Sequence, residues 1–361
     1  MEGDCDVCST ALTEGVMEGE EDETMNVFQW TKVDKKVRKV SITFGVTELI
    51  SELNARVTVL KKHIYVKRCQ NKYYNTLKTD LKPGQLLLNV DYSENYVNQE
   101  QQEIQSAYFG HDCFSIFTAC CYLRAANGDL INENITVTSE ASEHSRISAH
   151  TCVMTIIEKV QDLHPEEFNS TLFIWSDGCA AQFRSRFVFY LLARMDKKYE
   201  VEWCYNERHH GKGPMDGIGG TIKNKVFRDV KSGKIHINGA KSFAEHADHC
   251  INNITSLYLP LQNVLEEPDG IESAQKIPST LQVHRVVRNF NDDGVCKLKF
   301  YRVANDDLPF HEQFYRKPGD PEVCDHELLP LSYNQDSTCA KCKGNYIGKE
   351  FTKYFSNVLF F

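Results

Sequence analysis

Three aspartates in the sequence stand where they could hold metal ions for phosphodiester chemistry. Asp91 directly follows the apolar run 86–90, and Asp177 directly follows the run 171–176. Asp216 lies in the first turn of a predicted helix. Short apolar runs bounded by turn residues are typical of buried strands. We therefore expect Asp91 and Asp177 at strand ends, and all three carboxylates at one edge of a sheet.

The chemistry expected of such a cluster depends on cations. Like charges repel and raise each other's pKa, and a divalent cation offsets that repulsion. Mg2+ prefers oxygen ligands and keeps part of its water shell, so a few carboxylates are enough. Two ions about 3.5–4 Å apart can hold the attacking and the leaving oxygen of an in-line phosphoryl displacement. We predict that Asp91, Asp177 and Asp216 are catalytic residues and ligands of two Mg2+ or Mn2+ ions. Taken singly, each aspartate also fits an ordinary turn or cap.

The elements that must position these aspartates are predicted from periodicity and turn signals. From residue 85 to residue 230 the order is strand, strand, strand, helix, strand, helix, strand, helix. A three-strand meander followed by alternating helices and strands is typical of a mixed α/β fold. It matches a ribonuclease H-like core, with a five-stranded mixed sheet and flanking helices. It does not suit a doubly wound dinucleotide-binding fold.

The whole chain divides by composition into four segments. A helix is predicted over 47–80, and two strands of a small β subdomain are predicted over 280–288 and 296–303. The segments are an acidic tail that we expect to be disordered (1–26), a helical N-terminal segment (27–82), the ribonuclease H-like core (83–256) and a C-terminal extension (257–361).

The charge of the chain is acidic overall but uneven. The formal net charge is −9 and the isoelectric point is about 5.8, which argues against a nucleic-acid partner. Residues 212–241, however, hold seven lysine or arginine residues and only two aspartates. We expect this basic segment to contact a phosphate backbone. The candidate nucleic-acid contacts in and near it are Lys212, Lys223, Lys225, Arg184 and His210, with packing in a glycine-rich loop as the alternative for His210.

Fourteen cysteines in a sequence that opens without a secretory signal indicate a reducing compartment, either the cytosol or the nucleus, where cysteines are thiols or metal ligands. No run approaches about 18 apolar residues, so no membrane span is expected. Cys5 and Cys8 form a Cys-x-x-Cys pair in the acidic tail without evident partners. A candidate Cys3His zinc site is formed by Cys324, His326, Cys339 and Cys342, although its first two ligands are spaced more tightly than is usual.

Three stretches of the sequence, residues 89–96, 175–183 and 210–220, resemble a group of transposon-derived metazoan proteins with DDE-type transposase cores. The similarity spans residues 28–290. It implies metal-dependent DNA cleavage and strand transfer, with the three aspartates as metal ligands. It also implies DNA as the partner, assembly into homo-oligomers and a nuclear location.

The sequence departs from active transposases ahead of residue 85, where we find no helix-turn-helix and no complete zinc finger. An active enzyme would then have to recognise transposon ends through residues 28–80. The alternative is a domesticated, catalytically inactive chain that acts as a DNA- or protein-binding module.

Overall fold

The structure is a computed structural model, and it describes residues 23–98, 111–208, 213–291 and 294–315. It separates into two units, and the boundary lies within helix α1 (Val46–Thr79). The first unit extends to Arg68, and the second begins at Cys69. The helix predicted over 47–80 is confirmed by α1.

A β-hairpin precedes α1 in the first unit. Strands β1 (Thr24–Val33) and β2 (Lys36–Gly45) pair antiparallel along their whole length. The turn residues Asp34 and Lys35 have φ values of 50° and 64°, as a two-residue hairpin turn of type I′ requires.

This hairpin corrects the prediction of a tail up to residue 26 and a helical segment from residue 27, since residues 24–45 form strands. Hairpin turns of this type favour glycine at the second position, where this chain has Lys35. The sequence therefore lacked the usual signal for a turn at this point.

A nine-stranded mixed sheet forms the body of the second unit, so the predicted α/β fold class is confirmed. Its strand order is β11-β10-β9-β7-β6-β3-β4-β5-β8. The pairs β3–β6, β6–β7 and β5–β8 are parallel, and the other pairs are antiparallel. The strands are β3 (Gly84–Val97), β4 (Cys113–Arg124), β5 (Leu130–Ser139), β6 (Phe168–Ser176), β7 (Glu200–Tyr205), β8 (Thr255–Tyr258), β9 (Arg285–Phe290), β10 (Cys296–Tyr301) and β11 (His311–Tyr315).

The order of elements predicted from residue 85 to residue 230 is present within this unit. β3, β4 and β5 form a meander, and α3 (Arg146–Leu163), β6, α4 (Arg186–Arg194), β7 and α5 (Pro214–Lys231) follow in turn. Helix α6 (Ala240–Cys250) comes next. The five predicted strands lie side by side as β5-β4-β3-β6-β7, with β3 in the centre.

Local signals explain where the helices begin. Ser145 precedes α3, and its side-chain oxygen accepts the backbone N–H of Ser148 at 3.1 Å. Ser185 does the same for Val188 at the start of α4. Serine is favoured at such positions because its hydroxyl satisfies an N–H that the helix leaves unpaired.

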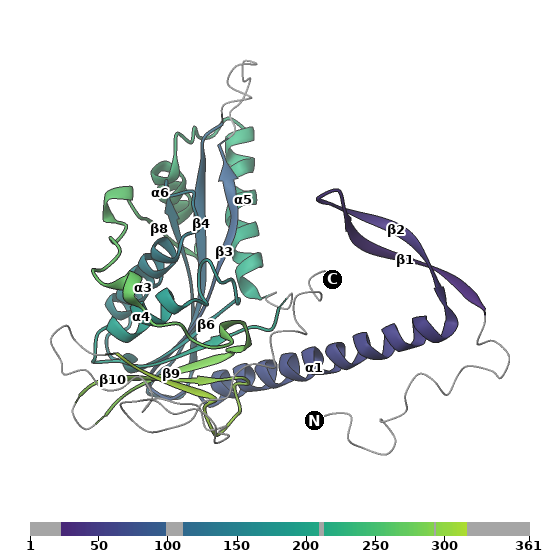
Figure 1. Ribbon diagram of the computed structural model, residues 1–361. Helices are drawn as coiled ribbons and strands as arrows, with labels where there is room; N and C mark the ends of the chain where they lie inside the picture. The colour runs from purple at the N-terminus through teal and green to yellow at the C-terminus, as the bar shows by residue number, and fades with distance from the viewer. Residues whose placement is uncertain (1–22, 99–110, 209–212, 292–293, 316–361) are drawn as a thin grey trace. The chain divides into compact units, whose positions relative to one another are not determined.

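Alternation along β3 divides the core into two layers, because successive side chains of a strand point to opposite faces. Leu86, Leu88 and Val90 pack in a cluster with residues of α3 and α4. Leu87 packs in a second cluster with residues of α5 and α6. Figure 1 shows α5 along one side of β3 and β4, and α3 with α4 along the other. Both faces of the central strands are therefore covered by helices.

The sheet is larger than the predicted five strands. The predicted strand 296–303 corresponds to β10, whereas the predicted strand 280–288 matches β9 only from residue 285, because residues 280–282 form a 3-10 helix. Both strands belong to the central sheet instead of a separate subdomain. β9 pairs with β7, which covers an edge whose backbone groups would otherwise be unpaired. Three short 3-10 helices precede it: η2 (Leu261–Asn263), η3 (Ile271–Ser273) and η4 (Thr280–Gln282).

None of the helices in the described part of the chain is long and apolar enough to cross a membrane.

Candidate functional site

Asp91 and Asp177 lie at the same level on neighbouring strands. The parallel register of β3 and β6 pairs Asn89 with Trp175, and each aspartate follows its paired residue by two positions. Neighbouring strands lie about 4.7–4.9 Å apart. Register alone therefore places these two acids, which are far apart in sequence, next to each other.

The position of Asp91 within its strand differs from the prediction. β6 ends at Ser176, just before Asp177, as expected. β3, however, continues past Asp91 to Val97. The backbone oxygen of Asp91 accepts a hydrogen bond from Thr118 Oγ1 of β4 at 3.0 Å. Asp91 is thus held in mid-strand, beyond the point where its parallel neighbour stops.

The start of α5 brings Asp216 to the same region of β3. Pro214 opens the helix, where its fixed φ and missing N–H are tolerated. Gly219 lies so close to β3 that a Cβ there would be 2.5 Å from Ser93 Oγ, so the helix can pack at this distance only with glycine. Asp216 is exposed one turn earlier, and a negative charge is favourable at a helix N-terminus.

Electrostatics connect the three carboxylates. Burial, followed by the charges of Asp177 and Asp216, raises the pKa of Asp91 to about 7. Burial also raises the pKa of Asp177, while the N–H of Cys179 and the charge of Arg184 lower it. Without a neutralising cation, Asp91 exchanges its proton near neutral pH. A raised pKa is expected of a buried carboxyl that other carboxylates approach.

Asp177 is fixed by the turn that follows β6. Its Oδ1 accepts the backbone N–H of Cys179 at 3.0 Å. The next residue, Gly178, lies against the side chain of Arg184, so that a Cβ at 178 would be 2.6 Å from the Arg184 Cζ. Only glycine lets the guanidinium approach this turn so closely.

Arg184 does not have the predicted role. Its side chain is buried, with 1% of its surface exposed, and its Nη1 donates to the carbonyl oxygen of Val283 at 3.0 Å. The prediction that Arg184 contacts nucleic acid is wrong, because the guanidinium is not accessible to a phosphate backbone. It is instead a fixed positive charge near Asp177.

The three carboxylates are of the ligand type that Mg2+ and Mn2+ prefer. Their oxygens do not all lie within 4.8 Å of one another; in the described part of the chain, that criterion is met by Asp229, His246 and Cys250. Two ions about 3.5–4 Å apart have separate sets of ligands, so a paired site does not require all its carboxylates to touch. The three carboxylates therefore do not surround a single ion as they are placed.

The two predicted lysine contacts on α5 point in different directions. Lys223 follows Asp216 by seven residues, which is roughly 20° short of two full turns, so both lie on one face. Its Nζ lies 3.4 Å from the carbonyl oxygen of Glu94. Lys225 follows Asp216 by nine residues and points roughly 180° away. Its Nζ pairs with the carboxylate of Asp229, so the structure does not support Lys225 as a contact beside the aspartates.

Some predicted site residues lie outside the described residues. These are the candidate nucleic-acid contacts His210 and Lys212, the tail cysteines Cys5 and Cys8, and the candidate zinc ligands Cys324, His326, Cys339 and Cys342.

One polar residue beside the site was missed in the sequence. Asn89 is buried and precedes Asp91 by two positions, so both share a face of β3. Its Nδ2 donates to the hydroxyl of Tyr74 at 3.4 Å, and the Tyr74 ring packs edge-on against Trp175. Its Oδ1 is buried and has no hydrogen-bond partner among the described residues. The signal was a single amide inside an apolar run, at the spacing that places it beside Asp91.

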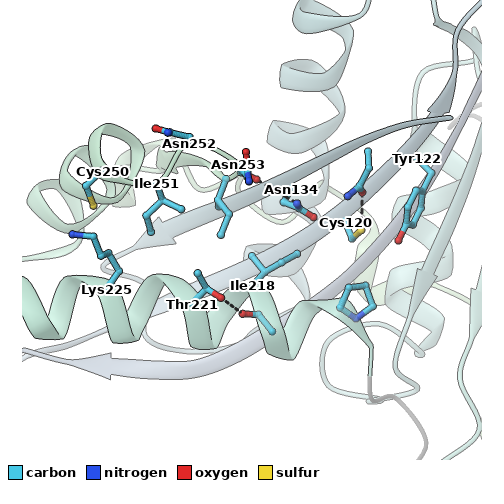
Figure 2. Close-up of a pocket in the computed structure, with 14 residues that line it drawn as sticks. Cys120, Tyr122, Asn134, Ile218, Thr221, Lys225, Cys250, Ile251, Asn252 and Asn253 are labelled. Carbon is cyan, nitrogen blue, oxygen red and sulfur yellow. Dashed lines mark hydrogen bonds between the residues drawn. The ribbon is translucent and has the colours of Figure 1, made fainter. Parts of the chain in front are cut away.

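A pocket of about 700 Å3 borders α5, and Pro214 and Gly217 in the first turn of that helix are among its lining residues. Figure 2 shows it between α5, the end of α6 and the neighbouring strands. Lys225 and Thr221 of α5 line one side, and Cys250 at the end of α6 lines another. None of the three aspartates lines it, although Gly217, the neighbour of Asp216, does.

Comparison with known proteins gives a family but no function. Residues 70–300 match the family described as "Domain of unknown function (DUF8701)". Because the match covers more than half of the chain, the chain belongs to this family. Neither the curated proteins nor the solved structures contain a match.

Proposed function

We propose that this member of the DUF8701 family is a DDE transposase-like enzyme that cleaves DNA phosphodiester bonds with divalent metal ions. The observation that carries the proposal is the register that sets Asp91 beside Asp177 on neighbouring strands, together with the pKa of Asp91, which burial and then the charges of Asp177 and Asp216 raise to about 7. Titratable groups with strongly raised pKa values and specific charged partners are typical of functional sites. The strand order β5-β4-β3-β6-β7, with only β3–β6 and β6–β7 parallel among these pairs, supports a ribonuclease H-like core.

The three aspartates would hold two Mg2+ or Mn2+ ions, which supply charge stabilisation for the attacking and leaving oxygens of an in-line displacement. Asp91 would hold its ion as a carboxylate, because the charge of the ion would offset both the burial of Asp91 and the repulsion from its neighbours. The N–H of Cys179 keeps the carboxylate of Asp177 in one orientation. Strand transfer uses the same displacement, with a DNA 3′-hydroxyl in place of water.

DNA would approach along the face of α5 that carries Asp216 and Lys223. Lys223 is the predicted phosphate contact that remains on this face, and its side chain is 24% exposed. An enzyme that acts on DNA would be located in the nucleus. A reaction at two DNA ends would also require the chain to assemble into homo-oligomers. The acidic net charge of −9 means that contacts to phosphate have to come from such local basic residues.

The test is nicking of supercoiled plasmid by the full-length protein, with Mg2+, Mn2+ or EDTA. We expect nicking with either cation and none with EDTA. Asp91→Asn and Asp177→Asn should each lower the rate by at least about a hundredfold, since losing a metal ligand removes several kcal/mol of transition-state stabilisation. Asp162→Asn, which changes an exposed carboxylate on α3, is the matched control and should keep the wild-type rate.

A second candidate function is a DNA-binding module without catalysis. The observation that favours it is that the oxygens of the three aspartates do not all lie within 4.8 Å of one another. In that case wild type and Asp91→Asn would show the same background nicking, while both would shift DNA in a gel with equal affinity. That result would reject the enzyme and leave the module.

A further inference from the structure

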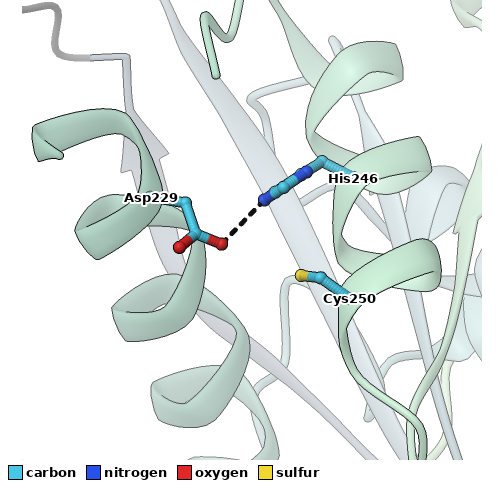
Figure 3. Close-up of side chains that lie close together, drawn as sticks. All are labelled: Asp229, His246 and Cys250. Carbon is cyan, nitrogen blue, oxygen red and sulfur yellow. Dashed lines mark hydrogen bonds and ion pairs between the residues drawn. The ribbon is translucent and has the colours of Figure 1, made fainter. Parts of the chain in front are cut away.

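A group of three potential metal ligands lies between α5 and α6. Asp229 is on α5, and His246 and Cys250 are four residues apart on α6, so they lie one turn apart on the same face. Their ligand atoms all lie within 4.8 Å of one another. Figure 3 shows the three side chains pointing toward one another across the space between the two helices.

Three basic side chains already contact the carboxylate of Asp229. Its side chain is 7% exposed, and His246 Nε2 lies 3.0 Å from its Oδ2. Lys225 Nζ pairs with the same oxygen, and Lys234 Nζ lies 3.5 Å from Oδ1. The carboxylate of Asp229 is therefore contacted by two lysine ammonium groups and one imidazole.

The two lysines can leave this position more easily than the three ligands can. The side chains of Lys225 and Lys234 are 39% and 70% exposed, so water can solvate their ammonium groups when they turn away. Asp229 is buried, and His246 is 15% exposed. A divalent ion can thus replace the ammonium of Lys225 without rearrangement of the helices.

We propose that Asp229, His246 and Cys250 bind one Zn2+ ion. Carboxylate oxygen, imidazole nitrogen and thiolate sulfur are the three donor types of protein zinc sites, whereas Mg2+ prefers oxygen alone. Binding releases the thiol proton of Cys250 to solvent, because a coordinated thiol is deprotonated. The ring nitrogen of His246 that coordinates the ion carries no proton, so a proton on Nε2 has to move to Nδ1 or to solvent if Nε2 is the ligand. The site is chemically distinct from the three aspartates, and it does not depend on their function.

Three protein ligands leave a fourth position on a tetrahedral ion. Cys250 and Lys225 also line the pocket of about 700 Å3 (Figure 2), so this fourth position is next to solvent-filled space that can supply a water ligand. The ion would also join α6 to α5, the helix that carries Asp216 in its first turn. Zinc would therefore stabilise the packing on which the position of Asp216 depends.

The test measures metal binding directly and needs no enzyme activity. The protein is the full-length chain in which the cysteines of the two other candidate metal-binding segments are replaced by serine, namely Cys5, Cys8, Cys324, Cys339 and Cys342. Zn2+ is titrated against a chromophoric chelator, and Co2+ is used as a spectroscopic probe. We expect one equivalent of Zn2+ and a thiolate-to-cobalt charge-transfer band.

Single variants assign the ligands. Cys250→Ser should abolish the charge-transfer band, and His246→Gln should weaken Zn2+ binding on the order of a hundredfold. Cys113→Ser, at an exposed cysteine of β4, is the matched control and should change neither. Circular dichroism of each variant without metal checks the fold. If the parent protein binds no Zn2+ or gives no thiolate band, the proposal is rejected, whether or not the variants fold. It is also rejected if Cys250→Ser and His246→Gln fold and bind Zn2+ as the parent does.

Discussion

Replacing Asp91 by asparagine should stabilise the protein in the absence of metal ions while removing its metal-dependent activity. The pKa of Asp91 is about 7 in the folded chain, against an ordinary value of 3.8. The ionised form is therefore disfavoured by folding. The loss of stability begins as pH rises through 3.8, where the unfolded chain ionises, and is complete above 7, where the folded chain ionises as well. Asparagine has nearly the same shape and carries no charge.

The size of the effect follows from the difference between the two pKa values. Each unit corresponds to about 1.4 kcal/mol, so at pH 8 the ionised carboxyl lowers the free energy of unfolding by about 4 kcal/mol. At pH 5 the folded carboxyl is neutral and only the unfolded one is ionised, which leaves about 2 kcal/mol. At about 2 °C per kcal/mol, Asp91→Asn should raise Tm by about 8 °C at pH 8 and about 4 °C at pH 5.

The assay is thermal unfolding of wild type and Asp91→Asn in EDTA at both pH values, followed by the same measurement with Mn2+. Saturating Mn2+ should raise the Tm of the wild type and leave that of Asp91→Asn unchanged, because only the wild type has the complete ligand set. Asp162→Asn serves as the control for loss of one carboxylate, and it should change the free energy of unfolding by no more than about 0.5 kcal/mol.

Two results would refute this reasoning. In one, Asp91→Asn melts at or below the temperature of the wild type at pH 8 in EDTA. In the other, it is more stable by the same amount at both pH values. Either result would show that Asp91 does not have a raised pKa in the folded protein, and the case for a carboxylate cluster would be lost.

Two further predictions concern packing within the second unit. Gly219→Ala should lower the free energy of unfolding by about 1–3 kcal/mol in urea denaturation, because its Cβ would overlap Ser93. Gly220→Ala, where a Cβ has open space, should raise it by up to about 1 kcal/mol, and equal effects at the two positions would contradict the packing described. Arg288→Met should lower the free energy of unfolding by about 3 kcal/mol or more, because the buried Arg288 donates hydrogen bonds to four backbone carbonyls between residues 192 and 199. Arg194→Met, at an exposed position of α4, is its control, and a similar loss there would show that burial is not the cause.

The sequence by itself determined the local elements around the aspartates. Apolar runs with strand spacing, turn residues and helical periodicity are properties of neighbouring residues, so β3 to β7 and α3 to α5 could be placed in order. That order was enough to predict that Asp91 and Asp177 would meet. The prediction from local patterns was wrong for the hairpin of β1 and β2, because its turn has Lys35 where glycine usually marks such a turn.

Only the tertiary structure decided which side chains remain accessible and which helix faces meet. The charge of Arg184 could be read from the sequence, but its burial beneath the turn at Gly178 could not. Likewise, Lys225 is as basic as Lys223, yet it turns to Asp229 on the other side of α5. Asp229, His246 and Cys250 come together because α5 packs against α6. Such contacts depend on how distant elements pack, and periodicity within one element does not encode its partner.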